Sequence, residues 1–142
     1  MLFRSMKQSD VDLALAAPFT MLGSDGIRHG DQGHPRAAGA FPRFLKQYAA
    51  SGKMPLSEAI AKVTTLAAQR LGLPQKGSLK PGCDADVVIF DLEKIADRAT
   101  YDQPVLPPVG IDQSFSHIEV NKNVCTPVIS ATFTMTNVQY YA

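Results

Sequence analysis

The fold is decided by residues 18–45, which read PFTMLGSDGIRHGDQGHPRAAGAFPRFL. The apolar run PFTML at 18–22 predicts a short buried strand, because proline does least harm at the first position of a strand. Residues 23–38 form a polar, glycine-rich loop, and loops of this length without secondary structure of their own are usually functional or disordered. Residues 40–50 then place apolar side chains at helical spacing, with Pro42 tolerated in the first turn. This stretch therefore predicts a strand, a long loop and a helix in that order.

Two more helices are expected on either side of this stretch. Residues 6–16, MKQSDVDLALA, combine apolar positions with polar residues that suit a helix start, and a proline follows soon after them. Residues 56–72, LSEAIAKVTTLAAQRLG, predict a clearer helix with Ser57 as its N-cap and an apolar stripe along one face. Gly72 ends this helix.

The character of the sequence changes at residues 76–91, which read KGSLKPGCDADVVIFD. Residues 80–83, KPGC, fit a type II turn, because proline presets φ at its second position and glycine supplies the positive φ at its third. Residues 87–90 are apolar and mostly β-branched in succession, which predicts a strand that is covered on both faces.

The remaining sequence predicts mostly extended structure. A helical turn is expected at residues 94–100, and residues 115–140 are rich in valine, isoleucine, threonine and aromatic residues, which predicts β-strands. The change from helical periodicity to turn and strand signals falls near residues 73–76. We therefore expect two domains, at residues 1–74 and 75–142.

The composition excludes several classes of protein. Hydrophobic residues make up 45% of the chain and charged residues 19%, which is typical of a globular domain. A net charge of +1 offers no strong field for nucleic acid or an anionic membrane. No segment has the length of a signal peptide core or of a membrane span. Cys83 and Cys125 form no CxxC pair, so neither a disulfide framework nor a thiolate zinc site is indicated. We expect a cytoplasmic chain without nucleic-acid or membrane partners.

Asp25 is the first candidate catalytic residue, because it follows the strand predicted at residues 18–22. An acid at the C-terminal end of a buried strand, followed by a loop and a helix, is what one βα unit of a barrel offers its active site. Such a carboxylate can take a proton from a metal-bound water, whose pKa the metal has lowered. Gly23, Ser24 and Gly26 are expected to shape the loop around it. An aspartate beside glycine in a turn is also a common structural feature, so this interpretation has an alternative.

Five segments of the sequence together resemble a known family. They read DVDLALAAPFTMLGSDG, HPRAAGAFPRFLKQYA, LSEAIAKVTTLAAQRLGL, KGSLKPGCDADVVIFD and DRATYDQPVLPPVGI, in that order. This combination resembles the C-terminal portion of the N-acyl-D-amino-acid deacylases, the D-aminoacylases of the amidohydrolase superfamily. The GSDG, HPR and FPR block is typical of the deacylases, whereas LKPGCDADVVIFD is similar to many amidohydrolases.

The resemblance implies a fold and a reaction. The family has a (β/α)8 barrel flanked by a small β-rich domain of the sandwich type. This chain is therefore expected to be an α+β fragment, with the last barrel strand and its helices followed by that small domain. In the family a zinc-bound hydroxide attacks the amide carbonyl of an N-acyl-D-amino acid, a linear amide, and releases a carboxylate and a D-amino acid.

The resemblance also assigns roles to individual residues. Asp25 matches the acid that acts as general base toward the nucleophilic water and then protonates the leaving amine. Arg36 matches the arginine that binds the α-carboxylate of the substrate, a role that suits the paired donors of a guanidinium. The alternative for Arg36 is a solvated loop cation. His34 and Pro35 are expected to shape the loop, since a single histidine rarely forms a metal site.

The metal ligands of the family are not recognisable in this chain. The resemblance implies an upstream His-x-His motif with further ligands on the middle strands, but this chain has three histidines and no His-x-His. We expect no metal site within the chain, with Asp25 as the one candidate ligand. Zinc then belongs to the full-length enzyme, and the isolated chain binds none and is inactive.

A fragment of a barrel leaves apolar surface uncovered. The helix faces through Phe44, Leu45, Ile60 and Val63 would lose the barrel that they are expected to cover. Self-association or strand exchange is the usual remedy, so we expect a homo-oligomer, most simply a dimer. The alternative function, from another class, is a non-catalytic α+β module for folding or oligomerisation.

Overall fold

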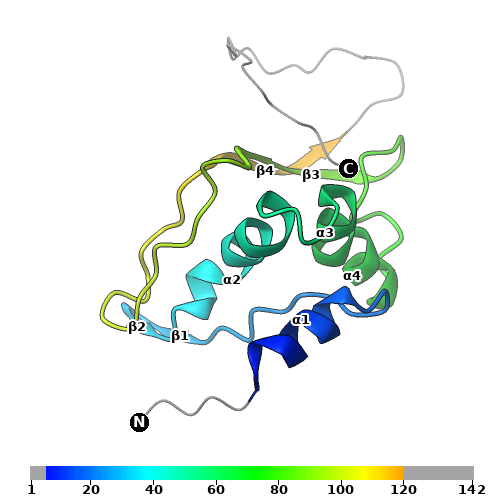
Figure 1. Ribbon diagram of the computed structural model, residues 1–142. Coiled ribbons are helices and arrows are strands. Elements are labelled where there is room, and N and C mark those ends of the chain that lie inside the picture. Colours follow the sequence, from blue (N-terminus) through cyan, green and yellow to red (C-terminus); the bar gives the residue numbers. More distant parts are fainter. Residues whose placement is uncertain (1–5, 120–142) are drawn as a thin grey trace.

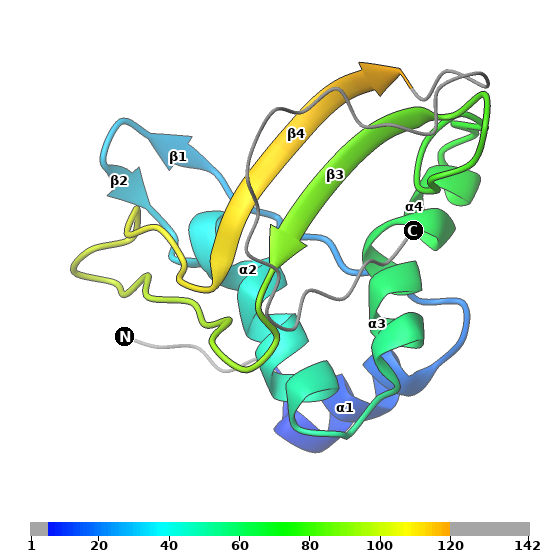
Figure 2. The same ribbon diagram turned by 90° about the horizontal axis from the view of Figure 1, so that it is seen from above.

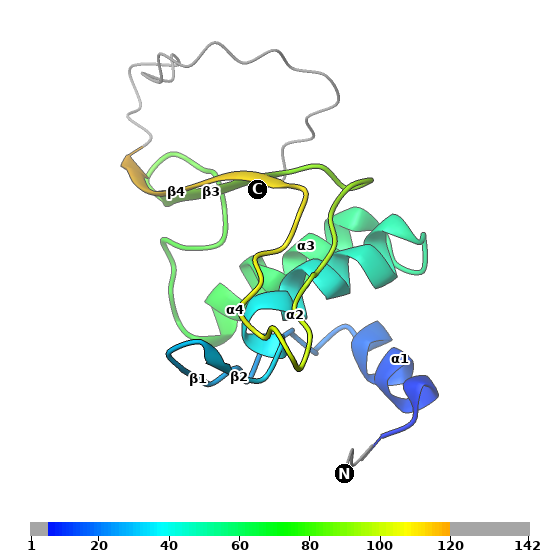
Figure 3. The ribbon, with the colours of Figure 1, turned by 90° about the vertical axis from the view of Figure 1, so that its left-hand side faces the viewer.

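The computed structural model describes residues 6–119 of the chain, and these residues form two layers. An antiparallel hairpin of β3 (Asp84–Phe90) and β4 (Ile111–Glu119) lies over a layer of helices, and the first helix lies on the opposite side of that layer (Figures 1 and 3). The other elements are α1 (Gln8–Ala16), β1 (Arg28–His29), β2 (Gln32–Gly33), α2 (Arg36–Phe44), the π-helix η1 (Leu45–Ala50), α3 (Leu56–Val63) and α4 (Thr65–Arg70).

The hairpin begins with the turn that the sequence predicts. Gly82 has a φ of +90°, and the Cys83 amide donates to the Lys80 carbonyl at 2.9 Å, as a type II turn requires. β3 confirms the strand predicted at residues 87–90, and it runs beside β4 along its length (Figure 2). The prediction that both faces are covered is wrong, because Val88 is 56% exposed. The hairpin instead has one face on the helices and one toward solvent, as antiparallel sheets often do.

The hydrophobic core lies between the hairpin and the helices. Its buried residues include Phe44, Leu45 and Ile60 from the helical layer and Ile95 from the segment after β3. Phe44 is 3% exposed and Leu45 and Ile60 are 7% exposed. The prediction that these helix faces are left bare is therefore wrong, because the chain covers them with its own hairpin.

The helix predicted at residues 40–50 begins earlier than expected and changes its type along its length. α2 begins at Arg36, so Pro42 lies inside the helix rather than in its first turn. Proline has no N–H for the helical ladder and crowds the preceding turn. The helix continues as η1, where the Leu45 amide donates to both Phe41 and Pro42 carbonyls. The π-helical segment thus begins three residues after the proline.

The helix predicted at residues 56–72 is interrupted. It begins at Leu56 with Pro55 at the N-cap, so the prediction that Ser57 caps it is wrong. At Thr64, φ is −132° and ψ is −88°, which separates α3 from α4. The Thr65 hydroxyl donates to the Gly77 carbonyl at 2.7 Å, so this break ties the helices to the loop that precedes β3.

The strand predicted at residues 18–22 is absent from the structure. Phe19 is 80% exposed, and within residues 6–119 no strand pairs with this segment. Backbone N–H and C=O groups form a strand only where a neighbouring strand pairs with them. The Leu22 amide donates instead to the Lys62 carbonyl at 3.3 Å. The segment is therefore held by α3 in an irregular conformation.

Two further expectations concern the second half of the chain. The helical turn predicted at residues 94–100 is wrong, because Ala96 forms an isolated antiparallel bridge with Val109. The β-rich part seen in residues 6–119 is a hairpin rather than a sandwich. Most of the strand region predicted at residues 115–140, and Cys125 with it, lies outside the described residues.

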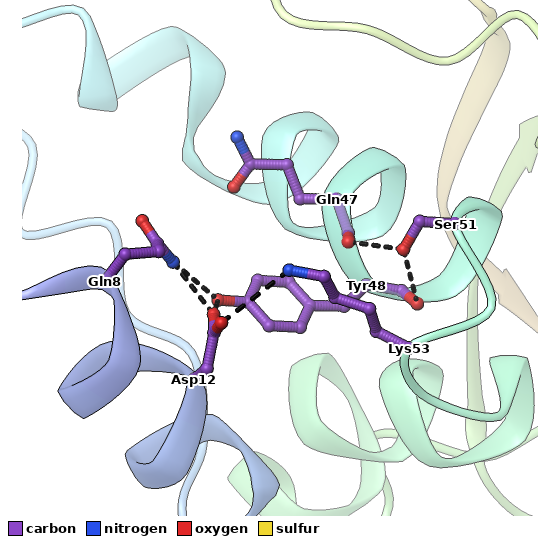
Figure 4. A network of polar contacts seen from close by, with 6 residues as sticks. All are labelled: Gln8, Asp12, Gln47, Tyr48, Ser51 and Lys53. Atoms are coloured by element: carbon purple, nitrogen blue, oxygen red, sulfur yellow. Dashed lines mark hydrogen bonds and ion pairs between the residues drawn. The ribbon is translucent and has the colours of Figure 1, made fainter.

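α1 has no fully buried residue, and it is joined to the rest of the molecule by Leu15, which packs against the core, and by polar contacts. Asp12 accepts hydrogen bonds from the Tyr48 hydroxyl at 2.6 Å and from Gln8 at 2.8 Å (Figure 4). The Lys53 ammonium lies 3.6 Å from the Asp12 carboxylate and 5.5 Å from the centre of the Tyr48 ring. This network connects α1 to η1. Across the described part of the chain, no helix has the length and apolar character needed to span a membrane.

Candidate functional site

The loop that the sequence predicts to be irregular contains a small hairpin of its own. β1 and β2 pair in antiparallel fashion, with His29 opposite Gln32. Gly30 is the first residue of the connecting turn and has a φ of +60°. A positive φ at this position is what a type II′ hairpin turn needs. Because this hairpin begins at Arg28, the irregular part of the loop around Asp25 is limited to residues 23–27.

Asp25 has an unusual backbone conformation. Its φ is +47°, and among residues 6–119 it is the one non-glycine residue with positive φ. Aspartate tolerates this left-handed region better than most residues do. The Ser24 hydroxyl accepts a hydrogen bond from the Gly26 amide at 3.3 Å. Gly26 is needed for close approach, since a Cβ there would lie 2.4 Å from the Ala37 Cα, whereas Gly23 has open space around it.

The structure brings Asp25 and Arg36 together. The Arg36 guanidinium lies 2.7 Å from the Asp25 carboxylate, and the two side chains are 43% and 81% exposed respectively. Exposed ion pairs of this kind contribute about 0–1 kcal/mol to stability. The pair therefore does little to stabilise the fold. The pair does bring an accessible carboxylate and an accessible guanidinium next to each other.

Residues 34–36 form the entrance to α2. The Arg36 amide donates to the His34 ring nitrogen Nδ1 at 3.1 Å, which satisfies one of the free amides at the helix start. Pro35 has a φ of −52° that suits the beginning of a helix, and its carbonyl accepts hydrogen bonds from Ala38 and Gly39. Through these contacts His34 and Pro35 hold the backbone of Arg36 at the start of α2.

Tyr101 is a neighbour of this site that the sequence analysis missed. Its hydroxyl lies 3.2 Å from His34 Nε2, and the two rings meet edge to face at 5.2 Å and 74°. Tyr101 sits in a turn in which the Gln103 amide donates to the Thr100 hydroxyl at 3.0 Å. The two residues are 67 positions apart, and no periodicity or spacing rule relates them.

Lys62 is the second residue that sequence analysis missed. Its side chain is fully buried, and its ammonium donates to the carbonyls of Ala17 at 2.6 Å and Thr20 at 3.3 Å. These carbonyls belong to the segment that leads into Asp25. A buried ammonium is stable only when its donors are satisfied. On the helical pattern alone, position 62 gives no sign of burial because lysine usually faces water.

Arg43 fixes the other side of α2. Its Nε and Nη2 atoms donate to the Asp97 carboxylate at 2.9 and 2.6 Å. Gly39 makes this approach possible, because a Cβ there would lie 2.9 Å from the Asp97 Cβ. α2 is therefore held against the segment that carries Tyr101 as well as against the loop of Asp25.

The described residues do not form a metal centre by themselves. Within residues 6–119, no three side chains of histidine, cysteine, aspartate or glutamate come together as metal ligands. The partner of Asp25 is a cation, Arg36, rather than a second ligand. The donor set on these residues therefore does not fit a zinc ion.

A separate apolar cavity of about 300 Å³ lies between the helices and the hairpin. Its walls include Pro42, Leu45, Ile60, Val63, Phe90 and Ile95. Neither Asp25 nor Arg36 lines it. The two predicted site residues thus lie together on the surface and outside this cavity.

Comparison with known proteins relates most of the chain to one family. Residues 5–121 match the Amidohydrolase family. The chain is 45% identical over 107 residues to the D-aminoacylase of Alcaligenes xylosoxydans xylosoxydans, a match that covers 75% of this chain and 22% of the relative. It is 37% identical over 121 residues to the N-acyl-D-glutamate deacylase of the same organism, covering 84% and 24% respectively.

Solved structures show the same relationship. A D-aminoacylase structure, described for its binuclear metal centre, superposes with a TM-score of 0.74 at 41% identity. The N-acyl-D-glutamate deacylase of Bordetella bronchiseptica, in complex with zinc and a phosphonate that mimics the tetrahedral intermediate, superposes with a TM-score of 0.73 at 39% identity. Each match covers 79% of this chain and 24% of the solved chain. The chain thus spans less than a quarter of the length of these relatives.

Proposed function

The chain belongs to the amidohydrolase family, and from this premise we propose that it is the C-terminal part of an N-acyl-D-amino-acid deacylase. The substrate is an N-acyl-D-amino acid, and the products are a carboxylate and a D-amino acid. The observation that carries the proposal is the pairing of Asp25 with Arg36 at 2.7 Å at the entrance to α2. The similarity to D-aminoacylase and N-acyl-D-glutamate deacylase supports the substrate class.

Asp25 is the proposed catalytic residue. Its carboxylate is 81% exposed, so a water molecule and a substrate can both reach it. It takes a proton from the attacking water and later returns one to the leaving amine, as a general base and acid does. Its backbone lies in the left-handed region, and its carboxylate lies 2.7 Å from the Arg36 guanidinium.

Arg36 is the proposed substrate-binding residue. One N–H group of its guanidinium faces Asp25, and a guanidinium has further N–H donors for the α-carboxylate of a substrate. Paired hydrogen bonds from arginine to a carboxylate fix its orientation as well as its position. A substrate held in this way places its amide at a defined distance from Asp25.

A zinc ion bound in the complete enzyme would activate the attacking water. The described residues of this chain supply Asp25 as a single candidate ligand, so the isolated chain is expected to be inactive and to hold no zinc. In the proposed full-length enzyme, residues 1–74 close a (β/α)8 barrel, and residues 75–142 belong to a small β-rich domain of the sandwich type. The proposed location is the cytoplasm.

Self-association is part of this proposal. Of the helix residues expected at the contact, Phe44, Leu45 and Ile60 are buried and Val63 is partly buried, so we expect the interface elsewhere. Leu13, Phe19 and Ile27 are 76%, 80% and 65% exposed and lie on the N-terminal segments of the chain. We expect copies of the chain to associate through this apolar surface.

The test places this chain in a complete enzyme. In the Alcaligenes D-aminoacylase, residues 6–119 of this chain replace the matching C-terminal segment, and hydrolysis of N-acetyl-D-methionine is measured. We expect the hybrid to hydrolyse the substrate and Asp25→Asn to lower kcat about a hundredfold to ten-thousandfold. Arg36→Lys should raise KM about tenfold, because lysine cannot replace the paired donors.

Asp31→Asn is the matched control, because Asp31 is an exposed acid in the same loop and should leave both constants unchanged. A hybrid in which Asp25→Asn retains full activity would overturn the role of Asp25. Zinc analysis of the unaltered chain tests the expectation that the isolated chain holds no metal. A metal-free, inactive chain agrees with the proposal, whereas stoichiometric zinc would show that its own residues complete a site.

The alternative function is a non-catalytic folding or oligomerisation module. The buried core of Phe44, Leu45, Ile60 and Ile95 favours it, because this core shows that the chain packs without a barrel. The hybrid enzyme distinguishes the two functions. A module would tolerate both Asp25→Asn and Arg36→Lys in the hybrid without a change in kcat or KM.

A further inference from the structure

The contact between Tyr101 and His34 links the segment after β3 to the entrance of α2. We propose that Tyr101 is a positioning residue that, through His34, holds the backbone of Arg36 in place. The substrate-binding role of Arg36 rests on the proposed function, whereas the positioning itself is a property of this chain. The loop of Tyr101 and the region of β2 and α2 approach each other in Figures 1 and 2.

The hydrogen bonds define the protonation of the His34 ring. The Arg36 backbone N–H can only donate, so His34 Nδ1, at 3.1 Å, must be the acceptor. The neutral ring then carries its proton on Nε2. This N–H donates to the Tyr101 hydroxyl oxygen at 3.2 Å. Two hydrogen bonds therefore run in one direction, from the Arg36 amide through the ring to Tyr101.

Tyr101 is held well enough to act as the fixed end of this chain of contacts. The Thr100 amide donates to the Gln103 carbonyl at 3.1 Å, and the Gln103 amide donates back to the Thr100 hydroxyl at 3.0 Å. The preceding residue, Ala99, is 5% exposed and anchors the turn in the core. The edge-to-face contact with the His34 ring adds a preferred orientation to the hydrogen bond.

The consequence for the site concerns the start of the Arg36 side chain. His34 contacts the amide of Arg36, and the guanidinium of the same residue contacts Asp25 at 2.7 Å. If the His34 ring turns away, the first turn of α2 loses an amide acceptor and can fray. The guanidinium then moves over a wider range relative to Asp25. Tyr101 therefore limits the motion of the Arg36 guanidinium through His34, and not through a contact with Asp25.

The test measures hydrogen exchange of the Arg36 amide by NMR in the whole chain. Tyr101→Phe removes the hydroxyl and keeps the ring, and we expect Arg36 exchange to rise about fivefold, the size expected for one hydrogen bond. His34→Asn is the second variant. An asparagine side chain can accept a hydrogen bond from the amide two residues later, but it is too short to reach Tyr101. In the His34→Asn background, Tyr101→Phe should therefore leave Arg36 exchange unchanged.

Two results would overturn the proposal. One is an unchanged Arg36 exchange rate in Tyr101→Phe with His34 present. The other is an equal acceleration in both backgrounds, which would show that Tyr101 acts by general loosening and not through His34. The Ala68 amide in α4 serves as the internal reference, and its exchange should stay constant in every variant.

The hybrid enzyme gives a second readout of the same residue. There Tyr101→Phe should raise KM for N-acetyl-D-methionine about fivefold and leave kcat unchanged, because Arg36 binds substrate and Asp25 performs the proton transfer. A lower kcat at constant KM would contradict positioning through Arg36. Exchange in the chain does not depend on hydrolysis, so failure of the proposed function and failure of this inference give different results.

Discussion

Asp25 combines a strained backbone with an exposed side chain, and the two properties can be separated by substitution. At a φ of +47°, Asp25→Asn should keep the conformation, because asparagine tolerates the left-handed region. Asp25→Ala should lower the free energy of unfolding by about 1 kcal/mol, because alanine does not tolerate it. Urea denaturation measures the difference. Equal stability of the two variants would show that the loop relaxes out of this conformation.

Lys62 is the residue whose loss should affect the loop from a distance. Lys62→Met keeps the volume of the side chain but removes the donors for the Ala17 and Thr20 carbonyls, so the free energy of unfolding should fall by about 1–3 kcal/mol. Urea denaturation measures this change, and exchange of the Leu22 amide should become faster. Lys80→Met is the control, because Lys80 is exposed and its loss should cost less than about 0.5 kcal/mol. A similar effect of both substitutions would contradict the role given to the buried ammonium.

At the scale of elements, the attachment of α1 to η1 should depend on pH. Burial and the hydrogen bond to Asp12 raise the pKa of Tyr48 from 10.0 to about 12. Because the pKa is raised in the folded state, the contribution of the Tyr48 hydroxyl to the free energy of unfolding is complete below pH 10. This contribution is lost as the pH rises toward about 12. Hydrogen bonds from Tyr48 and Gln8 lower the pKa of Asp12, so its contribution is lost as the pH falls below its usual value of 3.8.

Thermal unfolding followed by circular dichroism between pH 8 and pH 12 tests the predicted loss of stability at alkaline pH. Tyr48→Phe should be less stable at neutral pH and should lose less stability than the parent chain as the pH rises through the interval from 10 to 12. Val88→Ser is the control, because Val88 is 56% exposed on β3 and carries no titratable group, and its stability should fall with pH in parallel with that of the parent chain. A parallel decline in parent and Tyr48→Phe would assign the alkaline loss to other groups.

The elements differ in how well the sequence predicts them, for physical reasons. Local chemistry determines the turn at residues 80–83 and the strand at 87–90, and both are found. The strand predicted at 18–22 depends on neighbouring strands, and no local signal reports whether they are present. Pro42 is typical of the first turn of a helix, but α2 begins six residues earlier, at Arg36, which the local pattern does not indicate.

The candidate site shows the same division between local and distant information. Asp25 and Arg36 stand out because the loop and the family resemblance mark them, and the structure places them 2.7 Å apart, while their roles stay predictions. Tyr101 reaches His34 across 67 positions, and Lys62 is buried on a helix that looks amphipathic. Contacts of this kind depend on how the segments pack, so a single sequence does not reveal them.

At the scale of the whole molecule, the exposed apolar residues on the N-terminal segments predict association. Sedimentation equilibrium at micromolar concentration should show a dimer or a larger homo-oligomer, because Leu13, Phe19 and Ile27 offer apolar surface for burial. Phe19→Ser should shift the equilibrium toward monomer. Val88→Ser is the control, since Val88 is exposed on the hairpin, away from these segments. A monodisperse monomer of the parent chain would refute the proposed association.

The close packing of Gly26 on α2 sets a limit on how this loop can evolve. A side-chain carbon at position 26 would fall 2.4 Å from the Ala37 Cα, well inside the contact distance of two carbon atoms. Even alanine would therefore push the base of the loop off the helix and widen the gap that Asp25 and Arg36 now span. The distance between Asp25 and Arg36 thus depends on the absence of a side chain at Gly26. Related proteins that keep this distance are expected to keep the glycine.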